Sequence, residues 1–217
     1  MNNTIITESK LIRIIESISS AVLKIIDYVK SFGQKGKLPD FNGKLQDCYE
    51  DGLQTAFEWA KESTDDVGRN GIVWLKWYFR THITANFTFN KRGLIYVERS
   101  IDFNMSDDLS ALQFKSIGEC WSWKRFNSQS YCSTLDRFNT GTTQVILCGY
   151  VHPNSIDWTE TIYLNVYKMK KETEIRLNDN AFVEVAYIKI CGQKYPLGGS
   201  YILNASADKY NKNKENW

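Results

Sequence analysis

The sequence predicts an α+β protein in which a helical first third packs against a β-rich remainder. An apolar stripe with steps of four and three residues runs from 11 to 32, which is typical of one face of a helix. After residue 80 the pattern changes to short apolar runs separated by turn residues, as expected of strands. At 217 residues the chain can form one full hydrophobic core. We therefore expect a helical region at 1–80, a β-rich core at 81–207 and a loose polar tail at 208–217.

The first expected helix spans 11–32, with Thr7 or Ser9 as its cap and Gly33 at its end. Its apolar stripe predicts either packing on the body of the same chain or contact with a helical partner or a second copy. A second helix is expected over 44–63 and a third over 72–80.

The expected strands follow the third helix. Residues 83–89 alternate between apolar and polar, and a turn at 90–93 leads into a strand at 94–103. Further strands are expected over 144–151, 174–177, 181–190 and 200–204.

Composition and charge argue against several function classes. Hydrophobic residues make up 42% and charged residues 24%, and the formal net charge is +2, so the overall charge favours neither nucleic acid nor an anionic membrane as a partner. The five cysteines are scattered without a Cys-x-x-Cys pair, which predicts free thiols and no metal site. Because the start lacks a signal-peptide pattern and no apolar run reaches membrane-spanning length, we expect a cytoplasmic protein, in the cell that makes it or in a target cell.

Arg99 is the first candidate site residue. In the strand expected over 94–103 it shares its face with Ile95 and Val97, whereas Glu98 and Ser100 lie on the polar face. An inward guanidinium needs partners, because an unpaired buried charge is strongly unfavourable. The pattern leaves two partners open, a carboxylate of the same chain or the phosphate of a ligand.

Two further segments carry candidate residues. Ser122 lies between Trp121 and Trp123, whose indoles either wall a pocket for a flat heterocycle or pack in a half-buried strand. Glu172 and Glu174 lie two residues apart at the entrance to a strand, so their side chains should project to the same side. They indicate either a site that uses two carboxylates or a solvated strand edge neutralised by neighbouring basic side chains.

Taken in order, the inward Arg, the Ser in an aromatic strand after a Gly, and the Glu-x-Glu at the start of a later strand resemble the ADP-ribosyltransferase family. The likeness is to the branch with Arg, Ser-Thr-Ser and Glu-x-Glu motifs, which includes bacterial or phage effector-like proteins, and it covers about 94–190. The segment from Glu172 to Val185 matches best, whereas Trp121-Ser122-Trp123 keeps one hydroxyl where the family usually has three. The resemblance implies a mixed β core of two small sheets with an NAD cleft between them.

The resemblance also implies mono-ADP-ribosyl transfer from NAD, which is a substrate in this reaction. Glu174 would stabilise the oxocarbenium-like ribosyl cation that forms as nicotinamide leaves. Arg99 would hold the phosphate and ribose of NAD. Ser122 would orient the catalytic carboxylate and frame the nicotinamide, with Trp121 and Trp123 beside it.

On the acceptor side, the resemblance implies that Glu172 receives or orients the incoming nucleophile as a general base. In the family, Glu at this position accompanies arginine acceptors, so the expected partner is an arginine of a target protein. The loop 165–171 would read that acceptor, with Tyr167 as its contact aromatic.

Other activities fit the sequence less well. Only His82 and His152 could serve a hydrolase triad, and neither lies near a nucleophile signature. The segment 33–37 lacks both the preceding strand and the following Ser or Thr of a phosphate-binding loop. Two alternatives to the transferase remain: a non-catalytic binding protein on the same fold, favoured by the altered middle motif, and an NAD glycohydrolase without a macromolecular acceptor.

Overall fold

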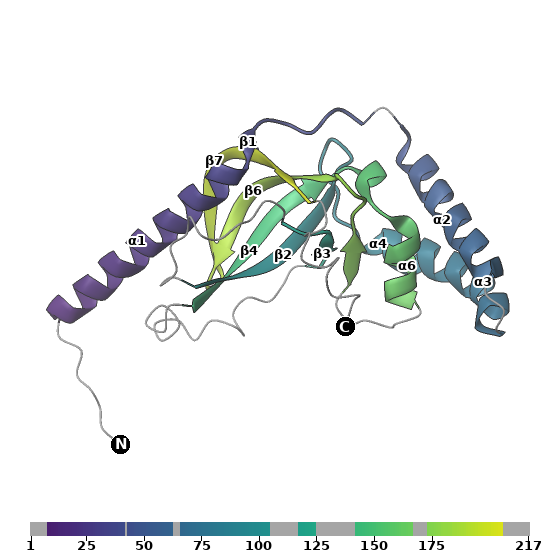
Figure 1. Ribbon diagram of the computed structural model, residues 1–217, viewed down its shortest axis with the longest axis horizontal. Coiled ribbons are helices and arrows are strands. Elements are labelled where there is room, and N and C mark those ends of the chain that lie inside the picture. The colour runs from purple at the N-terminus through teal and green to yellow at the C-terminus, as the bar shows by residue number, and fades with distance from the viewer. Residues whose placement is uncertain are drawn as a thin grey trace, which may run out of the picture.

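The computed structural model describes residues 8–41, 43–62, 66–104, 117–124, 142–166 and 173–205 (Figure 1). These residues form an α+β structure, which confirms the predicted class. The helices are α1 (Glu8–Phe32), α2 (Leu45–Glu62), α3 (Asp66–Tyr78), the π-helix η1 (Phe79–Ile83), α4 (Thr84–Asn86), the 3-10 helix η4 (Pro153–Ser155) and α6 (Trp158–Val166). The strands are β1 (Gln34–Lys35), β2 (Ile95–Asn104), β3 (Cys120–Ser122), β4 (Thr142–Val151), β5 (Glu174–Arg176), β6 (Phe182–Ile190) and β7 (Gln193–Asn204).

The described strands form one sheet in the order β1-β7-β6-β4-β2-β3-β5, and each of its pairings is antiparallel. The expectation of a mixed core of two sheets is therefore wrong for the described strands. The sheet nevertheless has a weak seam. β2 pairs with β4 along its whole length but with β3 through a single residue pair, Glu98 and Ser122. Within the sheet, the two-stranded β3–β5 ribbon is therefore joined to the other five strands through one residue pair.

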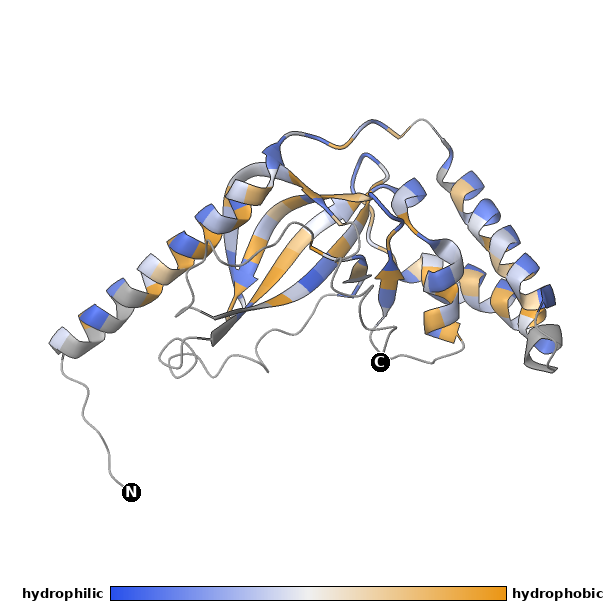
Figure 2. Cartoon of the chain, viewed as in Figure 1, coloured by the Kyte–Doolittle hydropathy of each residue, from blue (hydrophilic) through white to orange (hydrophobic). Residues whose placement is uncertain are grey.

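The first helix packs on its own chain. Val22, Ile25 and Val29 lie in the apolar stripe and are buried in the main core, which includes residues of β2, β4, β6 and β7. In Figure 1 the C-terminal half of α1 lies beside β7, while its N-terminal half extends beyond the sheet. Figure 2 shows hydrophobic and hydrophilic residues interleaved along this helix, as an amphipathic pattern requires. These apolar side chains of α1 are therefore buried against the rest of the same chain.

The remaining helices cover the other end of the sheet. α2 packs against α3 and α6, and it lies close to α6 at Gly52, where an added Cβ would lie 2.1 Å from Trp158 Cβ. Aromatic rings fill the space between the helices and the sheet, with Tyr49, Phe87 and Trp158 in mutual contact. Since α6 in turn packs on β5, this aromatic cluster connects the helical region to the ribbon.

The prediction of a strand over 83–89 is wrong. The chain is helical through η1 and α4 up to Asn86, and Phe89 makes only an isolated bridge to Ile95. The buried side chains here are Phe79, Ile83 and Phe87, which recur every four residues, while Ala85 is exposed. Ile83 and Phe87 belong to both patterns, and their burial follows the helical spacing of four residues rather than the alternation of a strand.

The helical and β-rich regions share a single main core cluster. Among the described residues, Cys48, Cys120 and Cys148 are free thiols. Within the described ranges, no helix has the length and apolar character needed to cross a membrane. The expected tail at 208–217 lies outside the described residues.

Candidate functional site

The central feature of the site is a row of side chains that crosses five neighbouring strands. Tyr187 of β6 pairs with Cys148 of β4, Cys148 with Glu98 of β2, Glu98 with Ser122 of β3, and Ser122 with Glu174 of β5. Directly paired residues of an antiparallel sheet project to the same face, with about 4.5–5.5 Å between their Cβ atoms. Two carboxylates, Glu98 and Glu174, therefore flank Ser122 on one face.

Ser122 is buried and is held to the turn that enters β5. Its Oγ lies 2.9 Å from Thr173 Oγ1, and the backbone N–H of Trp123 donates to the Thr173 carbonyl at 3.2 Å. Thr173 is the central residue of Glu-x-Glu and has a φ of 54°, a backbone conformation that β-branched residues rarely adopt. Its contacts with the β3 strand help to maintain this strained turn, which leads directly into Glu174.

Glu174 is buried but has a cationic neighbour. Its side chain is 10% exposed, and its Oε1 lies 3.8 Å from Arg176 Nη1. Arg176 also forms an ion pair with Glu119 and donates from Nη1 to Cys120 Sγ at 2.7 Å. Burial lowers the pKa of Arg176, but its electrostatic interactions with Cys120, Glu119 and Glu174 outweigh burial and raise it. The cation therefore stays charged beside Glu174, which is buried rather than placed on a solvated strand edge.

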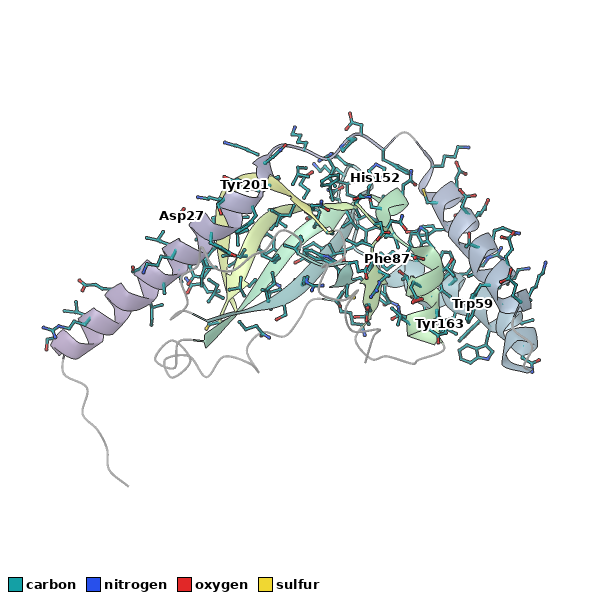
Figure 3. The ribbon with its side chains drawn as sticks, viewed as in Figure 1. Asp27, Trp59, Phe87, His152, Tyr163 and Tyr201 are labelled. Atoms are coloured by element: carbon teal, nitrogen blue, oxygen red, sulfur yellow. The ribbon has the colours of Figure 1, made fainter. Side chains whose placement is uncertain are left out.

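Helix α6 fixes the backbone of β5. Asn165 Nδ2 donates to the Glu174 carbonyl at 2.7 Å and to the Thr161 carbonyl at 2.6 Å. The backbone N–H of Arg176 donates to Thr161 Oγ1 at 3.0 Å. Figure 3 shows Trp59 and Tyr163 close together, and their ring centroids are 5.0 Å apart, which connects α6 to α2. Two α6 side chains thus hold the β5 backbone, Asn165 at Glu174 and Thr161 at Arg176.

Arg99 approaches the site from the other face of the sheet. Its Nη1 donates to the Cys120 carbonyl at 2.6 Å, and its guanidinium packs against Gly118. The Cys120 thiol has three charged neighbours. Its pKa is raised mainly by burial and also by a hydrogen bond to Glu174 and that residue's charge, while Arg176 and Arg99 oppose the rise. Arg99 and Glu174 thus both reach β3, but from opposite faces of the sheet.

The two indoles do not flank Ser122 as pocket walls. Trp121 and Trp123 are 2% and 5% exposed and belong to the main core, and Trp123 packs on Phe87 with ring centroids 5.4 Å apart. Neighbouring residues of a strand point to opposite faces, so a Ser on the polar face places both indoles in the core. The structure thus favours the half-buried-strand interpretation of the two tryptophans.

Two predicted site residues, Glu172 and Tyr167, lie outside the described residues. Asn165, expected at the start of an acceptor loop, is instead the buried penultimate residue of α6.

Sequence reasoning missed Glu98 and the α6 residues. Strand alternation places Glu98 on the polar face, but it is 0% exposed, because both faces of β2 are covered here. Helix α6 had a detectable signal: Asp157 accepts the Glu160 N–H through its side chain at 2.9 Å, and Trp158, Ile162 and Val166 recur every four residues.

A separate small cavity lies between α1 and the sheet. Its lining is mainly apolar: Tyr28, Val29, Phe32, Ile101, Ile117, Leu147 and Leu203. A dinucleotide needs charged and hydrogen-bonding partners, which these side chains do not supply. The residues around β3 and β5 are the better candidate site.

Comparison with protein-family models, curated proteins and solved structures finds no match to this chain. The functional argument therefore rests on the residues and their geometry.

Gly118 should be required for the position of Arg99. It has a φ of +75°, and an added Cβ would lie 2.6 Å from Arg99 Nη2. We expect Gly118→Ala to lower the unfolding free energy by about 1 kcal/mol more than Gly198→Ala, because overpacking is added to the strain of Ala at positive φ. Gly198 is the matched control, since its φ is +73° and no atom lies within 4 Å of an added Cβ. Urea unfolding measures both variants.

A second step tests the contact itself. In an Arg99→Ala background, Gly118→Ala should cost no more than Gly198→Ala. An equal loss by Gly118→Ala with and without Arg99 would show that the glycine serves only the turn.

Proposed function

We propose that the protein is an NAD-dependent mono-ADP-ribosyltransferase that modifies a macromolecular acceptor, with arginine of a target protein as the preferred class. One observation carries the proposal. Ser122 and Glu174 come from motifs far apart in the sequence, and they are direct cross-strand partners in neighbouring strands. The family resemblance requires this neighbourhood, because its serine orients its catalytic glutamate. Composition and hydrophobic pattern alone do not require it.

The chemistry of the pair suits ribosyl transfer. As the bond to nicotinamide breaks, positive charge develops on the ribose, and a nearby fixed carboxylate stabilises it. The Glu174 side chain is 10% exposed, so water screens its charge weakly. The α6 bonds to its carbonyl and to the next strand residues hold it in place before substrate arrives. Such preorganisation is the main protein contribution to electrostatic catalysis.

Arg99 would supply the anion-binding group. Its bond to the Cys120 carbonyl places a guanidinium next to β3, on the face of the sheet opposite Glu174. A phosphate of NAD that reached this edge could accept hydrogen bonds from its planar fork. Trp121 and Trp123 are not part of this proposal, because both are core residues. Ser122 remains the hydroxyl that orients the catalytic region.

A non-catalytic binding protein is the second candidate, and a specific contact favours it. Arg176 lies 3.8 Å from Glu174 and partly neutralises the carboxylate that would stabilise the cation. A protein of this kind would bind NAD without releasing nicotinamide. An NAD glycohydrolase would release nicotinamide without labelling an acceptor.

The experiment that separates these functions uses NAD labelled in its adenylate portion. The full chain is incubated with this NAD and a bacterial lysate, and the proteins are separated on a gel. A labelled band that withstands denaturation, together with nicotinamide release, supports the transferase. Nicotinamide release without a labelled band indicates a glycohydrolase. The absence of both nicotinamide release and a labelled band would contradict both enzymatic activities.

Glu172→Gln should separate transfer from NAD cleavage. Thr173 lies between the two carboxylates and has a φ of 54°, so regular strand alternation does not relate their side chains. The family resemblance implies that Glu172 would act on the acceptor while Glu174 acts on the ribose. We expect transfer to the acceptor to fall at least about 10²-fold, which is a typical loss for a general base, while hydrolysis of NAD by water stays within about threefold. A parallel fall of both activities would assign Glu172 to ribose activation or to the fold. Asp179→Asn, an exposed change after the same strand, is the control.

A further inference from the structure

A second polar cluster lies on the same face of the sheet as Ser122 and Glu174. Its centre is the fully buried Glu98, whose Oε1 accepts from Tyr96 OH at 2.5 Å and from Lys189 Nζ at 2.5 Å. Cys148 Sγ lies 3.7 Å from the same oxygen, and Tyr96 OH is 2.7 Å from Tyr187 OH. Donors from β2, β4 and β6 thus converge on one carboxylate oxygen.

The charges of this cluster depend on one another. Burial lowers the pKa of Lys189, but its hydrogen bond to Glu98 and the neighbouring negative charges outweigh burial and raise it. Burial, the charge of Cys148 and the bond to Glu98 raise the pKa of Tyr96. An ion pair of this kind gains little net stability over apolar residues of similar volume, whereas it fixes geometry closely. The position of the Glu98–Lys189 pair in the sheet therefore indicates which strands the pair orients.

Glu98 is also the one β2 residue whose Cα partner lies in β3. The β3–β5 ribbon joins the five-stranded body of the sheet through the Glu98–Ser122 pair. The side chain of Glu98 is anchored to β6, two strands away, while its backbone pairs with the strand that carries Ser122. A rotation of β2 at this residue would be transmitted directly to Ser122 and, through the next pair, to Glu174.

We propose that Glu98 is a positioning residue for the Ser122–Glu174 pair: its buried bonds to Lys189 and Tyr96 hold β2 in the orientation that seats the β3–β5 ribbon. The consequence for catalysis rests on the proposed transferase function. The positioning of the ribbon does not, so it can be measured in the absence of NAD.

The test variant is Glu98→Met/Lys189→Met, which removes both charges and keeps similar side-chain volume, so the fold should persist. Hydrogen exchange followed by mass spectrometry or NMR reports on local opening. We expect the amides that flank the ribbon and bond across it, those of Trp123 and Leu177, to exchange at least about tenfold faster than in the parent. Amides of β7 should change by less than about twofold, and the midpoint of thermal unfolding should shift by only a few degrees.

The matched control is Arg92→Met/Glu184→Met. This variant also removes a buried carboxylate and its cation, which lie 2.9 Å apart between Glu184 Oε2 of β6 and Arg92 Nη1. Both side chains bond to the backbone of Leu38 and not to the ribbon. It should leave exchange of the ribbon unchanged. Equal exchange of the ribbon in parent and Glu98→Met/Lys189→Met, or faster exchange in all strands alike, would overturn the positioning role.

Kinetics give the second readout. If the parent releases nicotinamide, Glu98→Met/Lys189→Met should lower kcat about tenfold with KM within about twofold, as loss of alignment rather than of binding predicts. An unchanged kcat would contradict a positioning role in the reaction. If the parent releases no nicotinamide, the proposed function fails, and the exchange experiment alone decides whether Glu98 seats the ribbon.

Discussion

Replacement of Glu174 by Gln is expected to lower the rate of NAD cleavage by roughly 10²–10³, the usual effect of losing one preorganised electrostatic contact. Gln keeps the shape of the side chain and its capacity to accept hydrogen bonds, but it lacks the charge that stabilises a ribosyl cation. NAD affinity should remain within a few-fold of the parent, because the carboxylate acts mainly in the transition state. Single-turnover kinetics measure the rate, and calorimetry measures the affinity.

Glu119→Gln is the matched control for this variant. Glu119 is the other carboxylate paired with Arg176, so its replacement disturbs the same guanidinium without touching the Ser122–Glu174 row. We expect Glu119→Gln to keep turnover within about fivefold of the parent, as for a residue outside the reacting centre. A loss as large as that of Glu174→Gln would mean that the charge balance of Arg176, and not the Glu174 carboxylate, determines the rate.

The largest expected effect on stability comes from Gly52→Val. Gly52 lies where α2 meets α6, and an added Cβ would lie 2.1 and 2.2 Å from Trp158 Cβ and Cγ. The indole cannot move freely, since it packs against Tyr49, Phe79 and Phe87. Overpacking of a core typically lowers stability by about 1–3 kcal/mol, and a β-branched side chain puts the loss at the upper end. Urea denaturation gives the value.

Gln54→Val is the control for this change, because Gln54 is an exposed residue of the same helix. Its replacement adds the helix-propensity effect of valine and removes one exposed hydrogen bond to Glu58. It should change the unfolding free energy by less than about 1 kcal/mol. Since α6 positions β5, Gly52→Val should also impair the Ser122–Glu174 site more than its stability loss implies. Equal stability of the two variants would show that α2 and α6 can separate without consequence.

The elements with strong periodic patterns could be predicted from the sequence. The α1 stripe, the α2 helix and the strands β2, β4 and β6 all appear close to their expected bounds. The errors have physical causes. Buried Phe79, Ile83 and Phe87 have helical spacing, but every second residue between 83 and 89 is also apolar, which suggested a strand.

The candidate site was predicted in part for similar reasons. Strand alternation correctly separated the faces of Glu98 and Arg99, but only tertiary packing reveals that Glu98 is buried. The row from Tyr187 to Glu174 depends on strand order and register, which pairing across the whole chain determines. The placement of Trp121 in the core follows from the same alternation that directs Ser122 to the opposite face of the strand.

The most direct measurement of the central claim is release of nicotinamide from NAD by the purified full chain, followed by chromatography and compared with Glu174→Gln. The proposal predicts release by the parent that grows with time and enzyme concentration, and a rate lower by roughly 10²–10³ for Glu174→Gln under the same conditions. No release by a folded parent protein, or equal release by both proteins, would contradict a catalytic site at Ser122 and Glu174.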